Sequence, residues 1–129
     1  MRKSLSWVRI PDVEKVEVEE MVERVLSSLP PLIRSRMENV EFVIEEKPSL
    51  HDGYSSFLLG LYQGVPLPRR GRGYSFVMPD RIVLFVGNIL RVAPTREAFY
   101  EKLKEVILHE IGHYFGFSEE DLQNLDKGS

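Results

Sequence analysis

Residues 106–119 read VILHEIGHYFGFSE, and this stretch decides both the expected fold and the expected chemistry. His109 and His113 are four residues apart, so on an α-helix they lie on the same side about one turn apart. Their ring nitrogens can then bind one metal ion. Two of the three histidines of the chain fall in this stretch, which favours a shared metal site over a chance pattern.

Glu110 lies beside the first histidine and is too close to the pair in sequence to be the natural third ligand. A carboxylate at this position can instead hydrogen-bond a metal-bound water and accept its proton. Zinc held by three protein groups keeps its fourth position for water and lowers the pKa of that water towards neutrality. The arrangement predicts a hydrolytic zinc centre with Glu110 as general base.

Gly116 is the third residue after His113, and it predicts the end of the helix. Glycine can adopt the left-handed conformation that ends a helix and reverses the chain. Such a reversal would bring Glu119 back towards the metal as a third ligand. Because the segment from Val106 onward is apolar almost all round, we also expect the metal-binding half of the helix to be buried.

Outward from this stretch, residue patterns predict the remaining elements. Helices are expected over residues 12–29, with Asp12 as N-cap, over 32–37, and over 96–115, with Thr95 as N-cap. Strands are expected over residues 40–46, 57–62 and 81–86. Gly60 should mark a bulge or a close backbone approach, and Gly87 and Asn88 should end the last strand. Glycines and prolines make residues 63–80 a loop or hairpin.

Length and composition limit the alternatives. The 129 residues predict a single domain over residues 1–129, with one core and no separate substrate-recognition domain. The absence of cysteine excludes thiolate metal sites, so a metal must be held by nitrogen and oxygen ligands.

The N-terminus begins with positive charge, but Arg9 and Pro11 interrupt it before an apolar run of signal-peptide length can form. No apolar run approaches the length of a membrane span. We therefore expect a cytoplasmic protein that does not enter a membrane. The net charge of −3 argues against general nucleic-acid binding, although residues 53–96 contain six arginines and one acid, a local excess of 6 − 1 = +5.

Several further residues carry two interpretations. His51 is interpreted as a surface loop residue, although it could approach a metal in three dimensions. Arg69, Arg70 and Arg72 either keep a loop tip soluble or bind a substrate carboxylate or phosphate, and the first interpretation is preferred. Tyr62, Tyr74 and Tyr114 could each stabilise an oxyanion, but nothing in the sequence selects one, and structural roles are preferred.

The whole stretch from His109 to Glu119 resembles the motif of the small bacterial zincin-like proteins, a family of metallopeptidases with a minimal zincin fold. The resemblance extends to LLGLYQGVPL at residues 58–67 and PDRIVLF at residues 79–85, so it covers about the C-terminal two-thirds of the chain specifically. It implies an α+β fold in which a small mixed β-sheet packs against a long N-terminal helix and the C-terminal metal-binding helix.

The resemblance also implies roles for the residues of the motif. His109 and His113 would be ligands of Zn²⁺, Glu110 the general base, and Glu119 the third ligand. The family usually has aspartate at the last position, and glutamate is one methylene longer. The choice of third ligand between Glu119 and its neighbours Glu120 and Asp121 therefore stays open.

Spacing separates this arrangement from other zincins. Only 16 residues follow His113, which disfavours a ligand from a later helix as in gluzincins, and no methionine follows Met78 to form the methionine turn of metzincins. A peptidase acting on peptide or protein substrates is the leading hypothesis. The rivals are a metal-dependent RNA hydrolase, whose family has glycine at position 110 and histidine at 119, and a metal-stabilised binding module without turnover.

Overall fold

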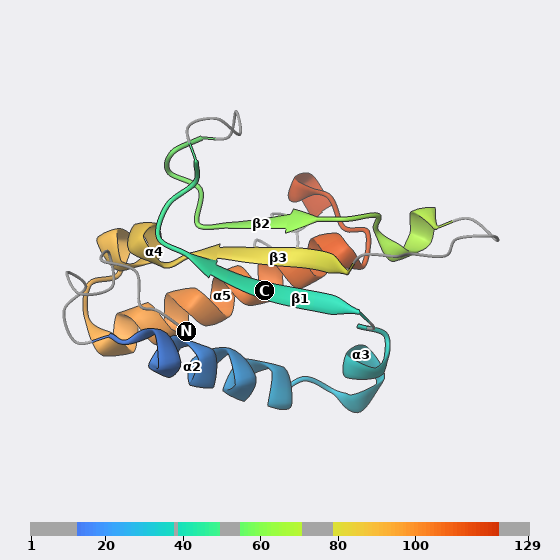
Figure 1. Ribbon diagram of the computed structural model, residues 1–129. Coiled ribbons are helices and arrows are strands. Elements are labelled where there is room, and N and C mark those ends of the chain that lie inside the picture. Colours follow the sequence, from blue (N-terminus) through green and yellow to red (C-terminus); the bar gives the residue numbers. More distant parts are fainter. Residues whose placement is uncertain (1–12, 38, 50–54, 71–78, 122–129) are drawn as a thin grey trace.

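The computed structural model describes residues 13–37, 39–49, 55–70 and 79–121 (Figure 1). Its elements follow in the order α2 (Lys15–Ser27), α3 (Pro31–Ser35), β1 (Val40–Glu45), β2 (Gly60–Gln63), the short 3-10 helix η2 (Leu67–Arg69), β3 (Asp80–Phe85), α4 (Val86–Val92) and α5 (Arg96–Tyr114). Mixed α and β structure confirms the expected α+β class.

The three strands form one mixed sheet in the order β1-β3-β2. β1 runs parallel to β3, with Val40 opposite Asp80, and β2 runs antiparallel to it, with Gly60 opposite Leu84. β3 is central because it is apolar on both faces, and its residues 82–85 are all buried. β1 and β2 are therefore the two edges of the sheet in the described part of the chain.

α5 and α2 pack beside each other on one face of this sheet, with α5 against β2 and β3 (Figure 1). α2 buries Val18, Met21, Val22 and Val25, which lie at helical spacings of three and four. It begins at Lys15 with Glu14 as its N-cap, so the expectation of an N-cap at Asp12, a residue outside the described part of the chain, is wrong. Apolar side chains from both helices and the sheet share one hydrophobic core.

α5 begins as predicted, because the hydroxyl of Thr95 accepts a hydrogen bond from the Ala98 backbone N–H at 3.1 Å. The helix then buries Phe99, Leu103, Ile107 and Ile111 in the core. This stripe fixes the rotation of α5 about its axis. It thereby determines which side chains point along the edge of β2.

Three further expectations about the elements need correction. The strand expected over residues 57–62 begins only at Gly60 and ends at Gln63, because residues 56–57 form a turn and Phe57 is 70% exposed. Val86 does not end the last strand but begins α4, a helix that the turn-like pair Gly87-Asn88 concealed. The expected loop over residues 63–80 contains η2, with Pro68 inside it.

No helix in the described residues is long and apolar enough to cross a membrane. The expected strands over 40–46 and 81–86 and the helices over 12–29, 32–37 and 96–115 otherwise agree with β1, β3, α2, α3 and α5 to within a few residues.

Candidate metal centre

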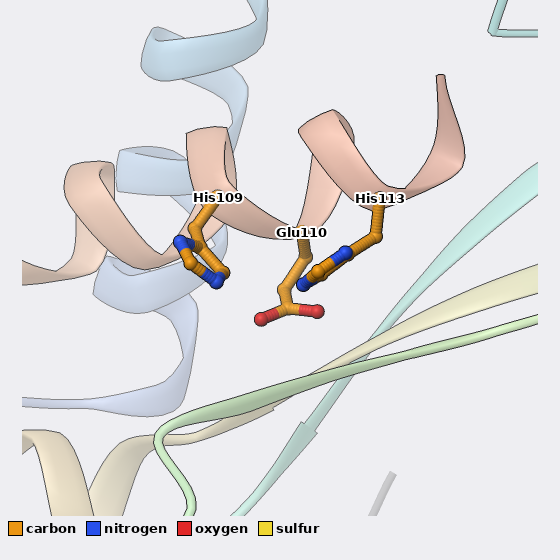
Figure 2. Close-up of side chains that lie close together, drawn as sticks. All are labelled: His109, Glu110 and His113. Carbon is orange, nitrogen blue, oxygen red and sulfur yellow. The ribbon is translucent and has the colours of Figure 1, made fainter. Parts of the chain in front are cut away.

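α5 places His109, Glu110 and His113 close together near its C-terminal end (Figure 2). One ligand atom from each of the three lies within 4.8 Å of the others. The two imidazole rings meet edge to face with their centroids 5.0 Å apart. The i, i+4 spacing thus brings both ring nitrogens to one point, as the sequence predicted.

Gly116 ends α5 and turns the chain back, with a φ of +98° that only glycine adopts readily. The Gly116 N–H donates to the carbonyl of His113 at 2.9 Å, and the Phe117 N–H donates to the carbonyl of Gly112 at 3.0 Å. This hydrogen-bond pair is a Schellman motif. A Cβ at Gly116 would lie 2.7 Å from Cγ of Pro68, so the turn also packs closely against η2.

Ser118 and Asp121 form the next turn of the chain by capping each other. The Ser118 N–H donates to the Asp121 carboxylate at 3.0 Å, and the Asp121 N–H donates to the Ser118 hydroxyl at 3.1 Å. This is a capping box, whose sequence signal is serine followed three residues later by an acid. This capping box was not predicted, although its signal is present in the sequence.

The capping box starts a new helical turn at Glu119 and directs its carboxylate at the two histidines. Oε1 of Glu119 lies 2.8 Å from Nε2 of His109 and 2.6 Å from Nε2 of His113. Asp121, the rival third ligand, is instead occupied by Ser118, and these hydrogen bonds keep its pKa below the usual value. The geometry therefore favours Glu119 as the third ligand.

His113 is held by a second hydrogen bond, between Nδ1 and the Phe117 carbonyl at 2.8 Å. A carbonyl oxygen only accepts, so Nδ1 carries the proton and Nε2 is the nitrogen that faces Glu119. Metal-binding histidines commonly donate their other N–H in this way. Burial lowers the pKa of His113, but its hydrogen bonds to Glu119 and Phe117 and the nearby carboxylates outweigh burial and raise it.

The residues fit a zinc ion in donor type and number: two imidazole nitrogens and one carboxylate oxygen converge, with no thiolate in the chain. Ligand atoms of a tetrahedral zinc site lie about 3.3 Å apart, given bonds of about 2.0–2.1 Å. The carboxylate of Glu119 is closer than this by about 0.5 Å to Nε2 of His109 and by about 0.7 Å to Nε2 of His113. Glu119 is exposed, so a small rotation of its side chain would open that space.

Glu110 is only 7% exposed, and one of its carboxylate oxygens lies within 4.8 Å of a ring nitrogen of each histidine. Its carboxylate accepts a hydrogen bond from the Tyr62 backbone N–H of β2, and its Cγ lies against Gly60. Burial raises the pKa of Glu110, against the opposing effect of the two histidines. A raised pKa suits a group that must both accept and return a proton near neutral pH.

Gly60 makes this contact possible. A Cβ there would lie 2.6 Å from Cγ1 of Val106 and 3.2 Å from Cγ of Glu110, so a side chain would force β2 away from α5. The expected close backbone approach is confirmed. The expectation of a buried metal-binding half is only partly correct, since Glu110 is buried but the two histidines are half-buried and Leu108 is exposed.

A cleft of about 490 Å³ opens beside these side chains, between α5 and the start of β2. Ten residues line it: Leu58, Leu59, Gly60, Lys102, Glu105, Val106, Leu108, His109, Glu110 and Glu119. Its volume is typical of sites that bind small molecules or short peptides. Two of the three candidate metal ligands, His109 and Glu119, thus line a cavity that is open to solvent.

The sequence pattern of the zincin-like metallopeptidase family matches residues 37–129, which is most of the chain. The chain belongs to this family. In this zincin-like protein the match begins just after α3 and includes β1, β2, β3 and α5. No curated protein matches the chain. The family implies a bound metal ion, typically zinc, and the His-Glu-His cluster of this zincin-like chain could hold one.

Two tyrosines considered for catalysis have structural partners in the zincin-like fold. The hydroxyl of Tyr62 donates to Asp80 at 2.7 Å, and the hydroxyl of Tyr114 donates to the Arg36 carbonyl at 2.8 Å. Burial and the bond to Asp80 raise the pKa of Tyr62 above its usual value. The third candidate, Tyr74, lies outside the described residues.

The structure describes two of the remaining candidate residues, Arg69 and Arg70. Arg70 forms an ion pair with the buried Asp80 and donates to the Val65 carbonyl at 2.8 Å, so it holds the loop after β2. Arg69 lies in η2 and shows no contact with the cleft. His51 and Arg72 lie outside the described residues.

Proposed function

We propose that this zincin-like protein is a zinc-dependent peptidase in which His109, His113 and Glu119 hold the metal and Glu110 is the general base. One observation supports it above all. Three metal-binding donor atoms converge on one point beside a buried carboxylate, at the wall of a cleft. A bound zinc ion would polarise the scissile carbonyl and lower the pKa of a coordinated water.

Residues of the chain itself would carry out the other steps of the reaction. Glu110 takes the proton of the attacking water and then returns it to the leaving amine, while the Tyr62 N–H holds its carboxylate in place. The Phe117 carbonyl orients His113, so that Nε2 faces the metal position. Packing of Gly60 against Val106 limits water on the β2 side of Glu110.

The edge of β2 offers a place for an extended substrate. Leu59 accepts a hydrogen bond from the Phe85 N–H at 3.0 Å, so the antiparallel alternation turns the backbone groups of Gly60 and Tyr62 away from β3. The Tyr62 N–H is used by Glu110, but the Gly60 groups face the cleft side. A peptide could add to this edge as a further strand.

The charges of the cleft favour peptides over RNA. Three carboxylates, those of Glu105, Glu110 and Glu119, line it against the single lysine Lys102, and this excess of negative charge would repel a chain of phosphate groups. Arg70 forms an ion pair with Asp80 and does not line the cleft. The local excess of arginine in the sequence is therefore weak support for an RNA hydrolase.

Replacement of Glu110 by glutamine tests the proposal. Zinc-loaded wild-type protein should cleave members of a broad peptide library, and Glu110→Gln should lower kcat/KM at least about a hundredfold while keeping stoichiometric zinc. Glu101→Gln is the matched control, because it removes an exposed carboxylate from the same helix. Peptide cleavage that survives in Glu110→Gln contradicts the assignment of the base.

The same preparations separate the rival functions. Cleavage of RNA without cleavage of any peptide would contradict a peptidase and support the nuclease hypothesis. Protein that holds zinc but acts on neither substrate would support a binding module.

A further inference from the structure

Lys102 lies on the same side of α5 as His109 and two turns before it. The separation is 109 − 102 = 7 residues, which corresponds to about 10.5 Å along the helix axis. Lys102 lines the cleft and is the only lysine or arginine among the described residues that do so. Its Nζ lies 3.1 Å from Oε1 of Glu105, with the lysine side chain 33% and the glutamate side chain 72% exposed.

The ion pair between Lys102 and Glu105 does not commit the lysine permanently. Exposed pairs three residues apart on a helix contribute little, because water screens them and two long side chains must be ordered. A ligand carboxylate in the cleft can therefore replace Glu105 as the partner of Lys102.

The cleft extends from the metal site in one direction only, towards Lys102. All the α5 residues that line it lie between Lys102 and Glu110, and the β2 side adds Leu58, Leu59 and Gly60. In the other direction, α5 ends and the turn at Gly116 packs against Pro68. Among the described residues, the space for a bound peptide therefore lies on the Lys102 side of the metal site.

The direction of β2 indicates which end of a peptide lies there. Gly60 lies against Val106, while Pro68, further along the chain, lies against Gly116, so β2 runs away from Lys102. A substrate paired antiparallel to β2, the more stable arrangement, therefore runs towards Lys102 and ends there in its C-terminus. Charge predicts the same orientation of the peptide, because a lysine attracts a terminal carboxylate and repels a terminal amine.

We propose that Lys102 binds the free C-terminal carboxylate of the substrate, so that the enzyme releases short C-terminal peptides of two or three residues. This inference rests on the proposed peptidase function. An extended chain advances about 3.3 Å per residue, so about three residues cover the distance from the metal site to Lys102. Leu58, Leu59, Val106 and Leu108 are apolar and favour apolar side chains on those residues.

The test compares hexapeptides of three alanines followed by three leucines, made with a C-terminal acid and with a C-terminal amide. Zinc-loaded wild-type protein should cleave the acid with at least tenfold higher kcat/KM, mainly through a lower KM. Lys102→Met should abolish this preference, and Lys102→Arg should retain most of it. Lys104→Met, which removes an exposed lysine of the same helix outside the cleft, should leave it unchanged.

Binding to zinc-loaded Glu110→Gln protein gives a measurement that does not depend on turnover. The acid peptide should bind at least tenfold more tightly than the amide, and the added Lys102→Met change should remove the difference. Equal binding or equal cleavage of acid and amide overturns the role of Lys102, even if peptides are cleaved. Absence of cleavage together with a Lys102-dependent preference in binding would instead contradict the proposed function alone.

Discussion

The two edges of the sheet carry cavities of similar size but different chemistry. The edge of β1 borders a groove of about 600 Å³ with α2 and α3, and the edge of β2 borders the cleft of about 490 Å³ with α5. The β1 groove has an apolar floor of Val22, Leu26, Phe42 and Ile44, and its charged residues are at its rim. Of these two cavities, only the β2 cleft is lined by a histidine and by a buried carboxylate.

The difference shows that cavity size alone does not identify the candidate functional site. The larger cavity contains no histidine and no buried carboxylate among its lining residues. The smaller one is lined by His109 and the buried Glu110, and burial raises the pKa of Glu110, the direction useful for a general base. Three substitutions, from the largest expected effect to the smallest, test this contrast between the edges.

Removal of a metal ligand should have the largest effect. His113→Ala should lose stoichiometric zinc and the stabilisation that zinc gives, which is about 4 kcal/mol for the wild type at a zinc concentration one thousand times Kd. Thermal unfolding with and without zinc measures it. Met37→Leu, a volume-conserving change in the β1 groove, should keep both zinc and its stabilising effect. Zinc stabilisation that is unchanged in His113→Ala would exclude this histidine as a ligand.

A side chain at the close approach of β2 to α5 should have the next largest effect. Gly60→Val would place atoms within van der Waals distance of Val106 and Glu110, and we expect about 1–3 kcal/mol of destabilisation from overpacking. Glu41→Val on the exposed side of β1 should change stability by about 0.5 kcal/mol or less. Urea unfolding compares the two edges, and similar effects at both would contradict the close packing at β2.

Removal of the capping hydroxyl should have the smallest effect of the three. Loss of an N-cap side chain costs about 1 kcal/mol. Because the capping box orients Glu119, we expect the same free-energy loss in zinc binding, so Ser118→Ala should weaken zinc affinity about fivefold. Competition with a chelator measures this affinity, and Ser118→Thr should restore it. Unchanged affinity in Ser118→Ala would show that Glu119 does not need the capping box.

Local signals explain what the sequence predicted well. The spacing of His109 and His113, the glycine at 116 and the threonine at 95 each act within a few residues, and the structure places all of them as expected. Long-range packing explains the failures. Gly87 and Asn88 resemble a turn, but Asn88 is buried and donates to the carbonyls of Ser56 and Leu58 at 2.8 Å, a contact across about thirty residues.

The choice of third ligand depends on both a local signal and long-range packing. The sequence favoured Glu119, through the turn expected at Gly116, but left its neighbours Glu120 and Asp121 open. The capping box that occupies Asp121 is local and its signal was readable, whereas the direction of the Glu119 side chain depends on the turn at Gly116 and its packing against Pro68. Sequence spacing alone could not supply that last contact.

All four side chains of the proposed centre come from one continuous segment, residues 109–119. An ion held by His109, His113 and Glu119 would cross-link groups at most ten residues apart, since 119 − 109 = 10. Closing so short a loop removes little entropy from the unfolded chain, and it ties no distant part of the sheet to another. We therefore expect the metal-free protein to keep its sheet and core, and metal loading to be a late step that converts a folded chain into its active form.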